Sequence, residues 1–300
     1  MSGTFVRSEL WTGAPSDCFP PTPDRAARPI RLGFAIIDDV SEIDRFRLDG
    51  RVALIGGGGG AIGGAIAEAF AEVGAKVVVA GRSGDKLDAT AGRIEAAGGE
   101  AVAVVADATV EVDADRMVAT TRDRFGRIDI VVNAVGGGAG DALHPAEEYP
   151  RDRWDWIMEL NVRSTVIPTQ AAVRAMVEQG HGGAVLNLSS VRANLGINAG
   201  YSAYVAAKGA ISALTRQWAT EWAKYGIRAN AIMPTFVDTP QVASLLSNPD
   251  FKAGIVNRIP LRRIGELRDL VGPAIFLCSD AASFVTGQVL GIDGGLTATQ

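Results

Sequence analysis

Short apolar runs alternate along the chain with segments in which apolar residues recur at helical spacing. The runs at 51–56, 76–81, 101–107 and 127–133 are rich in Val, Ile and Ala, which is typical of buried β-strands. Apolar side chains between them recur every three or four residues, which indicates amphipathic helices. We expect further strands at 184–190, 227–234 and 288–293, and helices at 61–74, 85–99, 111–125, 151–179, 203–224 and 267–278.

Strands that are apolar throughout and separated by helices are typical of a parallel sheet covered on both faces. With right-handed crossovers, this pattern predicts an α/β fold, a doubly wound, mostly parallel, seven-stranded Rossmann-type sheet in a single domain. Residues 1–45 differ, because five prolines fall close together there without any periodicity. We expect 1–45 to be an N-terminal extension, flexible or laid along the surface, and 46–300 to be the Rossmann-type domain.

The amino-acid composition excludes several classes of binding partner. The net charge is −5 and no basic patch stands out, so nucleic acid is not expected to bind. No apolar run is long enough to span a membrane. Two cysteines, Cys18 and Cys278, and two histidines, His144 and His181, are too few and too scattered for a disulfide framework or a metal site. We therefore expect no metal and a cytoplasmic location.

Glycine is abundant, with 36 residues in 300, and it is concentrated between the first expected strand and helix. The run from Gly56 to Gly64 is interrupted only by Ala61 and Ile62. A loop that binds a pyrophosphate needs glycine for its tight turn and for close approach of backbone N–H groups, and the helix that follows adds its positive end. The strand–loop–helix context predicts a dinucleotide site.

The residue after the second expected strand bears on which nicotinamide cofactor binds. A carboxylate there would hydrogen-bond the ribose 2′-hydroxyl of NAD and repel the 2′-phosphate of NADP. This sequence has Arg82 instead. A guanidinium pairs strongly with a phosphate. The sequence therefore favours NADP and leaves NAD possible.

Tyr204 and Lys208 stand four residues apart on one expected helix and so face the same side. Ser190 closes an expected strand, at the end where open α/β sheets hold their chemistry. A cation about 4 Å from the phenol, at an effective dielectric near 20, contributes about 4 kcal/mol, or about three pKa units. The pair thus predicts a general acid–base with a pKa near 7. Tyr201 has Val205 at the matching position and is not expected to act in this way.

The chain resembles the short-chain dehydrogenase/reductase family over about residues 47–298. The segment 56–63 corresponds to the family's TGxxxGIG, with Gly56 and Ala61 in place of the threonine and the middle glycine. Residues 133–136 (NAVG) correspond to NNAG, residues 234–239 (PTFVDT) to PGxxxT, and residues 287–295 (GQVLGIDGG) to the C-terminal signature.

The resemblance implies a role for each matching residue. Ser190 would hydrogen-bond the substrate oxygen, Tyr204 would exchange the proton, Lys208 would bind the nicotinamide ribose and lower the Tyr204 pKa, and Asn161 would support a water leading to Lys208. The implied cofactor-binding residues are Gly57, Gly60, Ala61, Ile62, Gly63, Arg82, Asp107, Ala108, Asn133, Gly136, Tyr204, Lys208, Val237 and Thr239. The family also commonly forms tetramers, so we expect a homo-oligomer, a tetramer or a dimer.

The substrate is less constrained. Segment 189–208, together with residues 232–235 (IMPT), is most similar to sugar-acid and polyol members of the family, such as those that resemble gluconate 5-dehydrogenase. Arg192, two residues after Ser190, could bind a substrate carboxylate or could be a solvent or interface arginine. Three functions stay open: oxidation of a secondary alcohol on a polyol or sugar acid, reduction of a 3-oxoacyl thioester or another hydrophobic ketone, and a non-catalytic nucleotide-binding scaffold.

Overall fold

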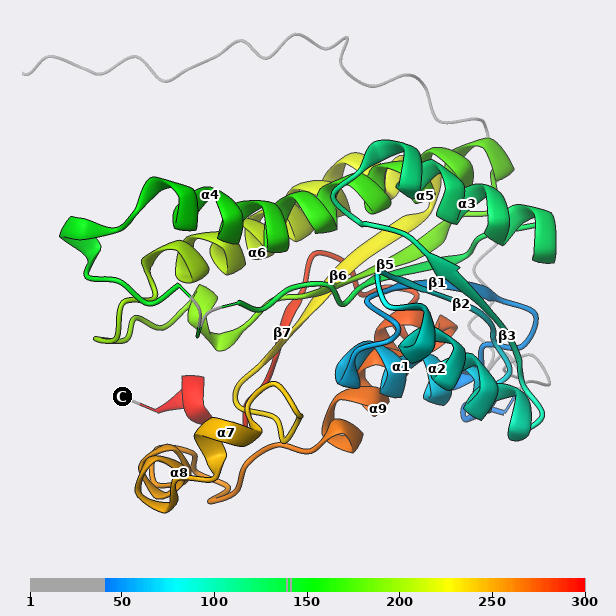
Figure 1. Ribbon diagram of the computed structural model, residues 1–300. Coiled ribbons are helices and arrows are strands. Elements are labelled where there is room, and N and C mark those ends of the chain that lie inside the picture. Colours follow the sequence, from blue (N-terminus) through cyan, green and yellow to red (C-terminus); the bar gives the residue numbers. More distant parts are fainter. Residues whose placement is uncertain (1–40, 139, 141, 300) are drawn as a thin grey trace, which may run out of the picture. The chain divides into compact units, whose positions relative to one another are not determined.

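In the part of the chain that the computed structural model describes, residues 41–138, 140 and 142–299, seven strands form one sheet in the order β3-β2-β1-β4-β5-β6-β7 (Figure 1). All six neighbouring pairs are parallel. The strands are β1 (Val52–Gly56), β2 (Lys76–Gly81), β3 (Glu100–Val105), β4 (Ile130–Asn133), β5 (Gly183–Leu188), β6 (Ile227–Pro234) and β7 (Val289–Ile292). The predicted doubly wound sheet is confirmed.

Helices cover both faces of the sheet (Figure 1). On one side pack α1 (Ala61–Glu72), α2 (Gly84–Ala96) and α9 (Leu267–Cys278), and on the other α3 (Glu111–Phe125), α5 (Ser164–Gln179) and α6 (Ser202–Trp222). Successive strand residues point to opposite faces. Ile55 accordingly packs with Phe70 of α1, whereas Leu54 packs in the other core with Met176 of α5.

Three further helices and a 3₁₀ turn lie at the end of the sheet where the strands finish or beside it. The helix α4 (Arg151–Met158) precedes α5, and the short helices α7 (Ala243–Leu246) and α8 (Pro249–Val256) follow β6 (Figure 1). A 3₁₀ turn, η5 (Val191–Ala193), follows β5. No helix among the described residues is both long and apolar enough to cross a membrane.

The prediction of a single long helix at 151–179 is wrong in one respect, because the helix is interrupted. The segment is α4, then a π-helical turn over Glu159–Arg163, then α5. Within the turn, the side-chain amide of Asn161 donates to the Ile157 carbonyl at 3.0 Å and so supplies a bond to the widened backbone. Such π turns are frequent at functional sites.

A chain of hydrogen bonds between buried polar side chains links β4 and β5 to the helices α5 and α6. The Asn133 side-chain amide donates to Thr169 Oγ1 at 2.7 Å and to Asn187 Oδ1 at 2.9 Å. The Asn187 amide in turn donates to Thr215 Oγ1 at 2.9 Å. All four side chains are buried. These bonds tie β4 and β5 to α5 and α6 and hold the strand ends in register.

The predicted N-terminal extension lies outside the described residues except for residues 41–45. Asp44–Phe46 form a 3₁₀ turn, and Arg45 donates from Nη2 to the Asp280 carbonyl at 3.1 Å and to Ser283 Oγ at 3.3 Å. Residues 41–45 therefore contact the Rossmann-type domain, and the boundary at residue 46 stays a prediction.

Candidate active site

The glycine-rich turn joins β1 to α1 at the carboxyl end of the sheet. The N–H groups of Gly57 and Gly58 donate to the Ala80 carbonyl of β2 at 2.8 and 3.1 Å, which anchors the turn. Gly57 has a φ of 79°, and a Cβ on Gly63 would lie 2.3 Å from the Gly57 carbonyl oxygen. The turn therefore closes on itself only because Gly63 has no side chain.

The amino end of α1 is open to an anion. The first backbone N–H groups of any α-helix have no acceptor within the helix. In α1 the preceding residue is Gly60, which has no side chain to accept from them. These N–H groups and the positive end of the helix dipole suit a phosphate.

A cavity of about 510 Å³ lies over this turn. Its walls come from the turn, the end of β2, the segment after β3, the end of β4, and the π-helical turn with the end of α4. Of the predicted cofactor residues, the lining includes Gly57, Gly60, Arg82, Asp107, Ala108 and Gly136. The chain reverses its order of strand addition between β1 and β4, which is where open α/β sheets bind dinucleotides. The residues present therefore fit a dinucleotide with its pyrophosphate on the glycine turn.

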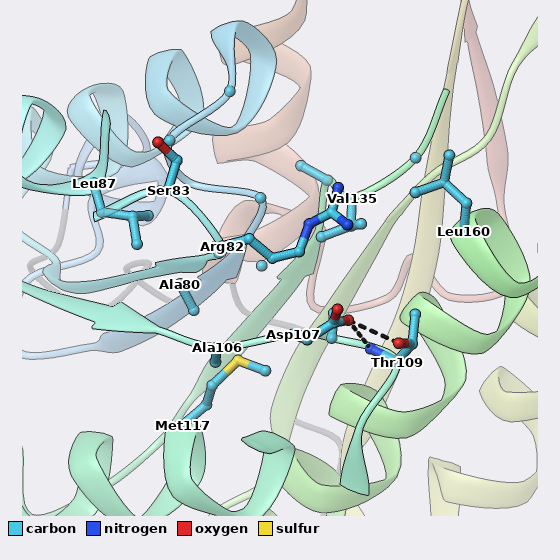
Figure 2. Close-up of a pocket in the computed structure, with 18 of the residues that line it drawn as sticks. Ala80, Arg82, Ser83, Leu87, Ala106, Asp107, Thr109, Met117, Val135 and Leu160 are labelled. Atoms are coloured by element: carbon cyan, nitrogen blue, oxygen red, sulfur yellow. Dashed lines mark hydrogen bonds between the residues drawn. The ribbon is translucent and has the colours of Figure 1, made fainter. Parts of the chain in front are cut away.

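Arg82 points into the cavity from the end of β2, on the same side as Asp107 (Figure 2). The Asp107 carboxylate accepts hydrogen bonds from the Thr109 N–H at 2.9 Å and the Thr109 hydroxyl at 2.8 Å. These bonds lower the pKa of Asp107, and the charge of Arg82 lowers it further. Arg82 makes no ion pair within the described residues, so its charge is available to a ligand.

Two of the predicted catalytic residues, Asn161 and Lys208, meet around Gly136. A Cβ placed on Gly136 would lie 2.8 Å from Asn161 Oδ1 and 3.1 Å from Lys208 Nζ, so the absence of a side chain there lets both groups approach. Asn161 is held by Gly137, whose N–H donates to Asn161 Oδ1 at 3.0 Å and whose carbonyl accepts from its amide at 3.1 Å. Lys208 is buried and donates to the Leu188 carbonyl at 2.9 Å.

The expectation that Lys208 brings the Tyr204 pKa near 7 stays a prediction. Lys208 Nζ lies 5.6 Å from the Tyr204 ring centroid. Burial raises the pKa of Tyr204 above its usual value, and the neighbouring Ser190 hydroxyl and Arg192 charge only partly oppose this. Burial also lowers the pKa of Lys208 to about 8. In the protein without cofactor, burial therefore acts against the ionised form of Tyr204.

Several predicted residues lie outside the cavity lining. Asn133 points its side chain into the core, where its Oδ1 has no partner, and a cofactor contact for it stays a prediction. Ala61, Ile62, Gly63, Tyr204, Lys208, Val237 and Thr239 also do not line the cavity, and their contacts with a cofactor stay predictions.

The segment after β6 lies against the end of β4. A Cβ on Gly137 would lie 2.2 Å from Gln241 Nε2, which places the chain beyond Thr239 over the site. Val237 pairs with Gly265 in an isolated parallel bridge, and Phe236 packs edge-on against Phe251 of α8 at 6.0 Å. The chain two residues beyond Thr239 thus lies against Gly137, which also bonds Asn161.

Sequence reasoning missed other groups in the cavity wall. Ser83, Lys86, Thr109, Trp156, Glu159 and Leu160 line it with the predicted residues. Lys86 stands four positions after Arg82, in the first turn of α2, and two cations so close in the sequence could have indicated a shared anion. Trp156 lies on α4, and Glu159 and Leu160 lie in the π-helical turn, which the sequence did not reveal.

Comparison with known proteins supports this geometry. A family model described as Enoyl-(Acyl carrier protein) reductase matches residues 59–297. The chain is 37% identical over 262 residues to gluconate 5-dehydrogenase of Gluconobacter oxydans, covering 87% of this chain and 100% of that one. It is 35% identical over 250 residues to a 3-oxoacyl-acyl-carrier-protein reductase of Thermotoga maritima, covering 83% and 99%.

A solved structure agrees with the same assignment. The crystal structure of a gluconate 5-dehydrogenase from Burkholderia cenocepacia in complex with NADP and tartrate superposes with a TM-score of 0.80 at 35% identity, covering 87% of this chain and 100% of that one.

Fold, cavity and relatives together define an NAD(P)-dependent dehydrogenase. The chain belongs to the short-chain dehydrogenase/reductase family. The alternative of a non-catalytic scaffold is therefore set aside.

Proposed function

We propose that the protein interconverts a secondary alcohol and a ketone with NADP(H), on a polyol or sugar acid, with Tyr204 as general acid–base. The observation that carries this proposal is the meeting of Asn161 and Lys208 at Gly136, next to the cavity over the glycine turn. A relative 37% identical is a gluconate 5-dehydrogenase, which supports the substrate class.

The cofactor would be held by the groups that line the cavity. The glycine turn and the first N–H groups of α1 would bind the pyrophosphate, and Arg82 with Lys86 would bind a 2′-phosphate. Asp107 would contact the adenine, and Lys208 the nicotinamide ribose. When bound, NADP supplies the acceptor for the hydride that leaves the carbinol carbon.

The chain's own residues would handle the proton. In oxidation the Tyr204 phenolate takes the hydroxyl proton of the alcohol, and in reduction the phenol returns it to the carbonyl oxygen. Ser190 would hydrogen-bond the same oxygen, since its hydroxyl already lies close enough to lower the Tyr204 pKa. Lys208 would stabilise the phenolate while it is charged.

Reduction of a 3-oxoacyl thioester is the second candidate, because the chain is 35% identical to a reductase of that type. Nicotinamide absorbance separates the two when purified protein is given polyols, sugar acids, hydrophobic ketones and a 3-oxoacyl thioester, each with NADP(H) and NAD(H). Turnover of a polyol or sugar acid with NADP supports the proposal. Turnover confined to thioesters or hydrophobic ketones favours the second candidate.

Replacing Arg82 by alanine is expected to weaken NADPH binding about 10- to 100-fold, because a charge-assisted pair with the 2′-phosphate is lost. NADH affinity should change less than about threefold. Fluorescence titration of both nucleotides measures this, with Arg93→Ala as the control because Arg93 of α2 pairs with Glu68 of α1 and does not line the cavity. Equal losses for both nucleotides would show that Arg82 does not bind the phosphate.

The rates in the two directions are expected to depend oppositely on pH. Oxidation needs Tyr204 deprotonated, and burial raises the pKa of Tyr204, so kcat/KM for oxidation should climb on the alkaline side. Reduction needs the protonated phenol and should fall there. Above about pH 8 Lys208 loses its charge, because burial lowers its pKa to about 8, and the oxidation limb should then level off. Coincident profiles in the two directions would contradict this assignment.

We also propose a homo-oligomer, a tetramer or a dimer, in the cytoplasm. On α6 the rings of Trp218 and Trp222 stack with their centroids 5.0 Å apart. Trp218 is buried in the core of the same chain, so its role there is packing within the subunit. Light scattering of the purified chain measures the assembly state.

A further inference from the structure

Arg192 is a buried cation with no acidic partner among the described residues. Its side chain is 8% exposed, and its one hydrogen bond there runs from Nη1 to the Gly196 carbonyl at 3.3 Å. A guanidinium has five N–H donors, so most of these donors have no acceptor from the described part of the chain. An unpaired charge is costly to bury, and such a group is typically kept for a ligand of opposite charge.

The position of Arg192 places this charge beside the reacting groups. Its backbone N–H donates to Ser190 Oγ at 3.2 Å, and its Cζ lies 6.0 Å from the Tyr201 ring centroid. The positive charge of Arg192 also lowers the pKa of Tyr204, so the guanidinium is close to that phenol as well. A substrate whose hydroxyl meets Ser190 and Tyr204 therefore has Arg192 within reach of another part of the same small molecule.

A second cation approaches from the segment that follows α8. Arg258 is exposed and forms no ion pair within the described ranges. It is near enough to lower the pKa of Arg192 by like-charge repulsion. Arg192 and Arg258 come from separate parts of the chain, and neither forms an ion pair among the described residues. An anion bound there relieves the repulsion and satisfies the unused donors.

We infer that Arg192, assisted by Arg258, binds the carboxylate of the substrate, so that the enzyme acts on a sugar acid rather than on a neutral polyol. This inference rests on the proposed function, since it places the carboxylate of an alcohol that is oxidised at Ser190 and Tyr204. Arg192 would bind through its planar fork, and Arg258 would close over the carboxylate from the side of α8.

The test compares matched pairs of six-carbon substrates that differ only in whether C1 is a carboxylate: gluconate and glucitol, galactonate and galactitol, mannonate and mannitol. The selectivity is the ratio of kcat/KM for the acid to that for the polyol, measured on the full chain saturated with NADP. Arg192→Gln should lower this ratio about 10- to 100-fold, and because both substrates meet the same variant, any general damage cancels. Arg192→Lys should restore part of it, since the charge is kept and the fork is lost.

Arg258→Gln, at an exposed position that cannot unfold the core, should lower the same ratio about 3- to 10-fold. The control is Lys252→Gln, which removes an exposed cation of α8 and should leave the ratio unchanged. A wild-type ratio near one, or a ratio that does not change in Arg192→Gln and Arg258→Gln, overturns the inference and leaves the proposed function standing.

Calorimetric titration of the NADP-saturated protein with each acid and polyol separates the two failures. If hydrophobic ketones or thioesters are the only substrates turned over, the proposed function is wrong. Binding of the acids that depends on Arg192 would then still support an anion site, and the absence of such binding would overturn it.

Discussion

Replacement of Tyr204 by phenylalanine is expected to lower kcat by about 10²- to 10⁴-fold, because the variant keeps the ring but loses the group that exchanges the proton. NADPH affinity should stay within about threefold, since the cavity over the glycine turn is not lined by Tyr204. Stopped turnover with intact fluorescence titration of NADPH is therefore the expected pair of results.

Tyr201 supplies a matched control for this substitution. It stands one turn before Val205, its ring centroid lies 6.3 Å from that of Tyr204, and it is likewise partly buried. Tyr201→Phe likewise removes one phenol hydroxyl from this region, but from a tyrosine that has no lysine four residues after it. Its kcat should stay within about threefold of wild type. Undiminished turnover in Tyr204→Phe, or an equal loss in both variants, would sink the assignment of the proton to Tyr204.

Replacement of Gly63 by alanine should weaken NADPH binding by about 100-fold or more. The added Cβ would lie 2.3 Å from the carbonyl oxygen of Gly57 and 2.8 Å from its carbonyl carbon, and both atoms belong to the backbone of the turn. The turn must therefore move, which misplaces the N–H groups that face the pyrophosphate. Nucleotide titration and the melting temperature together measure the change.

Gly92 offers the comparison for this glycine substitution. It lies on α2, and a Cβ there meets nothing within 4 Å. Gly92→Ala should bind NADPH like wild type and should raise stability by up to about 1 kcal/mol, because alanine favours the helix. If both alanine variants bind NADPH equally well, close packing at Gly63 does not control the phosphate site.

Most of the fold could be predicted because it rests on local patterns. Strands such as β2 are apolar on both faces, and helices such as α3 begin and end where their periodicity does, so their bounds matched closely. The glycine turn was recognisable because its function requires a residue type that few other positions tolerate. Arg82 was identified from its place after a strand end, which is a property of the topology, and Asp107 from the resemblance to the family.

The remainder depended on three-dimensional packing. The orphan Oδ1 of Asn133 and the bonds of its amide arise from contacts with α5 and β5 that no spacing encodes. The raised pKa of Tyr204 follows from burial, which the sequence could not quantify against the charge of Lys208. The convergence of Arg192 and Arg258 joins segments far apart in the chain and is likewise invisible before folding.

The π-helical turn over Glu159–Arg163 makes the site sensitive to the deletion of a single residue, which has a different effect from a substitution. An α-helix rotates by about 100° per residue, so the loss of one codon there would restore regular α geometry and turn one flanking helix relative to the other by that angle. Either Asn161 would leave Gly137 or the buried face of α5 would leave the core. The length of this segment and the placement of the Asn161 amide therefore depend on each other, and a homologue that changes one must change the other.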